Sequence, residues 1–183
     1  MPVNLDTDTT PRAWIGCLAC YNAGRLVGEW FDAEDADDVT LADVHGGTDR
    51  VRTGCEELWV MDHENMPRRG EMSPHEASEW ARVALSVPEH ERPALCAWVA
   101  SGDYTAEGDG DLPSVSDFED RYVGRWPSFR EYAENLADDI GLLAGAPEAL
   151  VSYFNWEAWS RDLAFDYTTE PAPGGDVYVF RVL

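Results

Sequence analysis

The sequence contains no lysine, and its 13 basic residues are all arginine. They are outnumbered by 36 acidic residues, which gives a formal net charge of -23 over 183 residues. A surface with so little positive charge repels nucleic acids and anionic membranes and is attracted to strongly basic clefts. We therefore expect a protein that binds neither nucleic acid nor a membrane.

Long apolar runs and a secretory leader are also absent. No run approaches the roughly 18 apolar residues of a membrane-spanning helix, and residues 1–10 have neither a basic start nor an apolar core. Four cysteines without such a leader are typical of a reducing compartment. These features predict a cytoplasmic protein.

Complete catalytic and metal-binding motifs are missing as well. Cys17 and Cys20 are spaced as C-x-x-C, but they fall in an expected strand, where residues three apart face opposite sides. We interpret both as small buried apolar residues and expect no metal site. The His-Glu pairs at 75–76 and 90–91 lack the second histidine of a zinc-protease motif. Without a nucleophilic triad or a phosphate-binding glycine loop, the sequence predicts a non-enzyme that needs no cofactor.

Apolar residues nevertheless make up 44% of the chain, and eight of them are tryptophan, which excludes a disordered acidic tail. The periodicities predict an α+β fold, with helices segregated from antiparallel strands. The expected strands are 13–21, 26–31, 57–62, 165–169 and 177–183, and the expected helices are 32–44, 74–87, 93–100, 129–143 and 156–163.

The chain divides on these patterns into three small domains, which we expect to lie in an elongated row. The predicted domains are an α+β domain at 1–61, a helical domain at 62–110 and an α+β domain at 111–183. Residues 102–113, rich in glycine and acids, are the predicted linker. The net charges of the three predicted domains are -8, -6 and -9 in chain order, so the negative charge is spread evenly along the sequence.

The helix expected after Ser128 shows how this charge is carried. Its apolar stripe, from Phe129 to Leu143, faces a core, while the acids from Glu131 to Asp139 face water. Glu131 and Asp138 lie about 10 Å apart along such a helix. The sequence predicts no cation beside this line of carboxylates.

Two interpretations of the charge follow from composition alone. The first is halophilic adaptation, in which the chain is an acidic binding module for a basic protein or a cation. The second is imitation of a polyanion. Duplex DNA carries roughly one charge per 1.7 Å of axis, so 23 net charges correspond to about 40 Å of duplex.

Three blocks of sequence, in order, resemble the ArdA-type antirestriction proteins. Residues 11–33 (PRAWIGCLACYNAGRLVGEWFDA) resemble the N-terminal signature of that family, and residues 118–141 resemble its C-terminal half. Residues 153–163 (YFNWEAWSRDL) are similar to its antirestriction motif. This chain has Asn155-Trp156 where the family usually has Asp-Tyr, and Trp159 where it has Phe.

The resemblance implies a specific function. Members of the family are elongated DNA mimics that dimerise through the C-terminal domain and occupy the DNA-binding groove of type I restriction–modification enzymes. It therefore implies a homodimer that inhibits such an enzyme by competition, with carboxylates standing where DNA phosphates would.

Two sets of residues carry these expectations. The acids expected to take the place of phosphates are Glu29, Asp32, Glu34, Asp35, Asp37, Asp38, Asp117, Glu119, Asp120, Glu131, Glu134, Asp138 and Asp139. The motif residues expected to hold the dimer are Tyr153, Phe154, Asn155, Trp156, Glu157, Ala158, Trp159, Arg161, Asp162 and Leu163.

Overall fold

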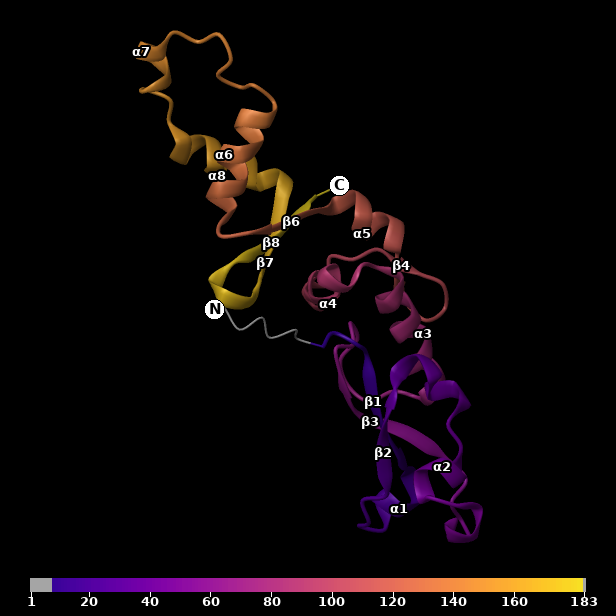
Figure 1. Cartoon of the computed structure of the whole chain (residues 1–183). Helices are drawn as coiled ribbons and strands as arrows, with labels where there is room; N and C mark the ends of the chain where they lie inside the picture. Colours follow the sequence, from indigo (N-terminus) through magenta and orange to yellow (C-terminus); the bar gives the residue numbers. More distant parts are fainter. Residues whose placement is uncertain (1–7, 183) are drawn as a thin grey trace. The chain divides into compact units, whose positions relative to one another are not determined.

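The computed structural model describes residues 8–182 (Figure 1). The chain forms two compact units, Met1–Val115 and Ser116–Leu183. Each unit combines short helices with a small antiparallel sheet, which confirms the α+β prediction. The elongated row of three domains, with boundaries at 61 and 110, stays a prediction. Among the helices of residues 8–182, none has the length and apolarity needed to span a lipid bilayer.

The first unit is built on a three-stranded antiparallel sheet with the order β2-β1-β3. Its strands are β1 (Arg12–Cys17), β2 (Gly28–Asp32) and β3 (Leu58–Glu64). Ala13 and Ile15 alternate along β1 and are fully buried. The central strand therefore fixes which face of the sheet is covered.

The predicted strand 13–21 is wrong after Cys17. There β1 ends and the chain turns directly into α1 (Leu18–Asn22). Gly24, with φ +73°, then turns the chain back toward β2. Just before β2, Val27 O accepts a hydrogen bond from the Cys17 N–H at 2.9 Å. Cys17 and Cys20 therefore lie on either side of a strand–helix junction, and the argument that their sulfurs face opposite sides does not hold.

The predicted helix 32–44 is also interrupted. A 3-10 helix, η1 (Ala33–Asp38), is followed by extended backbone at Val39 and then by α2 (Leu41–His45). Thr40 and Asp43 form a complete capping box at the start of α2, and Gly46 ends it in the left-handed conformation. A second 3-10 turn, η2 (Thr48–Arg50), follows. The capping box at Thr40 therefore starts a new helix, whereas the pattern of apolar residues predicts one helix over 32–44.

The helical part of the first unit agrees with the sequence. Helix α3 (Pro74–Ser86) begins with a complete capping box between Ser73 and Glu76, and α4 (Arg92–Ser101) follows the short turn η3 (Glu89–Glu91). Trp80 on α3 and Trp98 on α4 are buried. The two helices thus bury large aromatic side chains in a core of the first unit.

Residues 102–113, the predicted linker, form a small hairpin instead. Its strands are β4 (Ala106–Glu107) and β5 (Leu112–Pro113). The ring of Tyr104 packs edge-on against Trp80 and Trp98, with centroids 6.4 and 6.2 Å apart. This aromatic contact holds the segment against α3 and α4.

The second unit contains a sheet with the order β6-β8-β7. The terminal hairpin of β7 (Tyr167–Pro171) and β8 (Val177–Arg181) is confirmed, with the turn η5 (Pro173–Gly175) between its strands. Strand β6 (Tyr122–Trp126), which was not predicted, follows α5 (Val115–Arg121) and pairs with β8. Phe118, Tyr122 and Phe180 form an aromatic cluster beside this pairing.

Three helices and the turn η4 (Ala164–Asp166) complete the second unit: α6 (Phe129–Asp139), α7 (Glu148–Val151) and α8 (Trp156–Leu163). Helix α6 begins at Ser128 as predicted, since the Ser128 Oγ accepts a hydrogen bond from the Glu131 N–H at 3.2 Å. It ends at Asp139 and not at Leu143. Ile140, predicted to be part of the core stripe, is 58% exposed.

Candidate acidic binding surfaces

The first acidic surface is the outer side of η1. Ala33 and Ala36 are fully buried, one turn of a 3-10 helix apart, and they anchor the inner side. Between and after them Glu34, Asp35, Asp37 and Asp38 are exposed. At a rise of about 2 Å per residue, these four residues follow one another roughly every 3 Å along the axis of η1, close to the roughly 3.4 Å between charges along one DNA strand.

Arginine compensates part of this surface. Arg82 Nη2 lies 3.1 Å from an oxygen of Asp37 and also donates to Glu34 O at 3.2 Å. The hydrogen bond from Arg82 is the main reason that the pKa of Asp37 is lowered. Arg12 Nε lies 4.0 Å from Asp32 on β2.

Four predicted acids of the first unit form no ion pair within the described part of the chain. They are Glu29, Glu34, Asp35 and Asp38. All four are exposed, so their charge faces solvent without local compensation. They are the members of the predicted set best placed to meet a basic surface.

The second acidic surface is the solvent side of α6. Glu131, Asp138 and Asp139 are exposed. Glu134 is half-buried, and Arg130 Nε lies 2.7 Å from its Oε1. The prediction that no cation lies beside this line is therefore wrong, because Arg130 precedes Glu134 by one helical turn.

The acids of α5 differ in their exposure to solvent. Glu119 and Asp120 are exposed, whereas the side chain of Asp117 is only 14% exposed and forms an ion pair of 3.5 Å with Arg121. Arg121 is buried and donates from Nε to Arg181 O at 2.8 Å. Asp117 therefore helps to fix α5 to β8, and its charge faces inward.

The antirestriction-like segment forms a helix whose apolar side is only partly covered. Asn155 caps α8, since its Oδ1 accepts from the Ala158 N–H at 3.0 Å. Trp159 donates from its indole to Ala133 O at 3.3 Å, which attaches α8 to α6. No residue of α8 is buried in the single chain. Phe154 packs on Trp156 with ring centroids 4.7 Å apart.

The other motif residues lie at the surface. Tyr153 is 84% exposed. Glu157, Arg161 and Asp162 are exposed, and Arg161 lies 3.0 Å from Asp162. Ala158 and Leu163 are half-buried. In the elements just before and after α8, Leu150 is 61% and Phe165 is 82% exposed, so large apolar groups near the motif face solvent.

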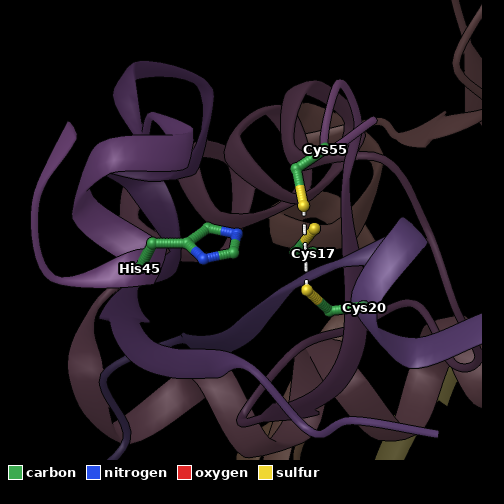
Figure 2. A group of neighbouring side chains, drawn as sticks. All are labelled: Cys17, Cys20, His45 and Cys55. Atoms are coloured by element: carbon green, nitrogen blue, oxygen red, sulfur yellow. Dashed lines mark hydrogen bonds between the residues drawn. The ribbon is translucent and has the colours of Figure 1, made fainter. Parts of the chain in front are cut away.

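A group of side chains that the sequence analysis missed lies in the first unit, apart from the acids of η1. It consists of Cys17, Cys20, His45 and Cys55, whose sulfur and imidazole nitrogen atoms all lie within 4.8 Å of one another (Figure 2). The three cysteines are buried, and none forms a disulfide. Only the C-x-x-C spacing signalled this group, since His45 and Cys55 are distant in the sequence.

Comparison with known proteins adds one finding. The family described as antirestriction protein (ArdA) matches this chain over residues 13–178. That range includes both acidic surfaces and the antirestriction-like segment. A comparison with curated proteins gives no match.

Proposed function

Because the chain belongs to the ArdA family of antirestriction proteins, we propose that it inhibits type I restriction–modification enzymes as a mimic of DNA. The family is one of non-enzymatic inhibitors that bind restriction–modification enzymes. The proposal adds the type of enzyme and the physical means: surface carboxylates take the positions of DNA phosphates in the DNA-binding groove.

The observation that carries the proposal is the arrangement of η1. Its buried alanines hold four acids, three of them without an ion pair in residues 8–182, at about the charge spacing of a DNA strand along the helix axis. A basic groove shaped for phosphates therefore meets a similar density of negative charge. The second unit carries exposed acids of its own, Glu131, Asp138 and Asp139 on α6 and Glu119 and Asp120 on α5.

The inhibition needs no chemical step. Lysine and arginine side chains of the enzyme bind the carboxylates, and the counterions held by the two surfaces are released into solution. The bound inhibitor and DNA then exclude each other from the same groove. Binding should weaken as salt concentration rises, as it does for DNA itself.

We also propose that the protein is a homodimer joined through the apolar side around α8. Tyr153, Leu150 and Phe165 are large apolar residues that are 84%, 61% and 82% exposed in the single chain, and a dimer interface would cover them. Aromatic residues are enriched in the buried centres of protein interfaces. Dimerisation would double the number of carboxylates presented to one enzyme.

The test is a competition experiment in solution. A fluorescent DNA duplex is bound to the methyltransferase core of a type I enzyme, and anisotropy is followed as the protein is added at low salt. We expect release of intact DNA, with no cleavage. Polyglutamate carrying the same total charge is the control and should displace much less. If the protein releases no DNA at low salt, the proposal is wrong.

A further inference from the structure

The ligand atoms of the buried cysteine and histidine group all lie within 4.8 Å of one another, close enough to surround a single metal ion. The Sγ atoms of Cys20 and Cys55 lie 3.7 Å apart. Two thiolates bound to one zinc ion, each at about 2.3 Å with a tetrahedral angle between them, lie about 3.8 Å apart. A disulfide would bring the sulfurs to about 2.05 Å. The separation of these two sulfurs, which as free thiols share a hydrogen bond, therefore also matches that of two thiolates on one metal ion.

The backbone brings these four ligands together from four different segments. Cys17 ends β1 and Cys20 lies one turn into α1, so that a strand–helix junction supplies the first pair. His45 is the last residue of α2. Cys55 follows Gly54, whose φ is +90°. The Cys55 N–H donates to Arg52 O at 3.1 Å. The Leu18 N–H, bonded to Glu57 O at 3.0 Å, ties the two cysteine segments together.

His45 provides an observation independent of the cysteines. Its Nε2 is buried, and none of the residues 8–182 offers it a hydrogen-bond partner. A buried polar atom without a partner is destabilising, and native proteins rarely retain one without a reason. The imidazole points toward the sulfur atoms (Figure 2), so a metal ion among them would give this nitrogen its missing partner.

We propose that Cys17, Cys20, His45 and Cys55 bind one structural zinc ion. Three sulfur ligands and one imidazole form a closed tetrahedral set of the kind that zinc prefers, with no position left for water or substrate. Arg25 Nη2 lies 3.9 Å from Cys20 Sγ, where it can balance thiolate charge from outside the ligand sphere. Three thiolates and one Zn²⁺ add one negative charge to the protein.

The ion would fasten the acidic segment to the sheet. Ligands on β1, α1, α2 and the loop before β3 enclose residues 26–49, which contain eight acids, including those of η1. These acids repel one another, and a bound metal ion would hold together the segments on either side of them. Zinc binding in such a unit is coupled to folding, because the unfolded chain has no preformed site.

The first test is the metal content of the full-length protein. The chain is produced in zinc-supplemented medium, purified without chelators under reducing conditions, and analysed by inductively coupled plasma mass spectrometry. We expect one equivalent of zinc per chain that persists through gel filtration. A folded protein with only traces of zinc, which also takes up none when zinc is added, would overturn the proposal.

Variants identify the ligands. Cys55→Ser and His45→Ala should each lose the bound zinc, whereas Cys96→Ser and His90→Ala should keep it. Cys96 is a half-buried cysteine outside the group, and the His90 side chain is 80% exposed, so the two controls match the residue types changed. Retention of one full equivalent by both ligand variants would contradict the assignment.

Cobalt substitution decides the case even if the ligand variants fail to fold. Co²⁺ in the wild-type protein should show the visible bands of tetrahedral cobalt and a sulfur-to-cobalt charge-transfer band in the near ultraviolet. A spectrum of octahedral cobalt without that band would overturn the site. So would a reduced, folded protein whose melting temperature is unchanged by zinc or by a chelator.

Discussion

Neutralising the uncompensated acids of η1 is the sharpest test of DNA mimicry. The variant combines Glu34→Gln, Asp35→Asn and Asp38→Asn and leaves Asp37 in place. Asp37 is excluded because it is bonded to Arg82, so its loss would disturb the packing of α3 as well as the charge. The three changed side chains are exposed and form no ion pair in residues 8–182, so the fold should be unaffected.

The expected magnitude follows from exposure. One solvent-exposed charge pair contributes about 0–1 kcal/mol, so each single change should weaken binding less than about fivefold. Together the three changes should cost about 1–3 kcal/mol, or roughly 5- to 150-fold in the dissociation constant. Fewer counterions are then exchanged on binding, so the salt dependence of the binding constant should become shallower.

The assay is DNA competition by anisotropy at two salt concentrations, with circular dichroism and thermal melting as checks on folding. A matched control changes three other exposed acids of the first unit, Glu107→Gln, Asp109→Asn and Asp111→Asn, which lie outside the expected binding set. This control alters the net charge equally and should weaken binding less.

Two results would refute the reasoning. If one carboxylate alone abolishes binding while the others have no effect, the protein acts through a specific site and not through a distributed field. If the η1 variant binds as tightly as the control, η1 does not contact the enzyme.

Three further predictions concern association and stability. Light scattering at micromolar concentration should give the mass of a dimer, and Tyr153→Ala should shift it toward the monomer without unfolding, because this side chain is 84% exposed in the single chain; a wild-type monomer would contradict the interface. Hydrogen bonds from the Ser73 N–H, then from Arg68 and the Ser73 hydroxyl, lower the pKa of Glu76 from 4.5 to about 2. Because the pKa is depressed in the folded state, the stability that Glu76 contributes is present above pH 4.5 and is lost as pH falls toward 2. Since the side chain is partly exposed, Glu76→Gln should lower the free energy of unfolding by about 1 kcal/mol at neutral pH and by little at pH 2. An equal loss at both pH values would refute this prediction. Finally, far-ultraviolet circular dichroism should show a folded protein in low salt, whereas a halophilic protein would unfold there.

Local chemistry made much of the fold predictable. Ser73, Ser128 and Asn155 each begin a helix where the sequence places a cap, because a side-chain oxygen beside free backbone N–H groups specifies a start almost independently of tertiary contacts. The terminal hairpin follows from two β-rich runs around a Pro-Gly turn. These elements are determined by residues within a few positions of one another.

The incorrect predictions concern features whose structure depends on contacts between residues distant in the sequence. β6 contains Gly124 and has only a weak strand pattern, and it becomes a strand because β8, more than 50 residues later, offers it a partner. The cysteine group was missed for the same reason. His45 and Cys55 have no recognisable spacing from the C-x-x-C pair, and only the folded sheet brings them to it.

The arginines explain how so acidic a chain keeps its negative surface and still holds together. Seven of the 13 form ion pairs with acids in the described part of the chain: Arg12, Arg68, Arg82, Arg121, Arg125, Arg130 and Arg161. Several bind a backbone carbonyl as well. Arg125, for example, donates from Nε to Asp176 at 2.7 Å and from Nη2 to Pro173 O at 2.6 Å.

A planar guanidinium can serve two such acceptors at once, which the single ammonium of lysine does less well. Part of the positive charge thus stabilises the fold, where Arg121 and Arg125 join a helix and a strand to the terminal hairpin. On the outer sides of η1 and α6, Arg82 and Arg130 each pair with one acid, Asp37 and Glu134 respectively. An acid paired with such an arginine should therefore matter for stability, and an unpaired acid on the same surface should matter for binding. Asp37 and Asp38 are adjacent in η1, and Asp37 is bonded to Arg82. Changing Asp37 should therefore affect mainly stability, and changing Asp38 should affect mainly binding.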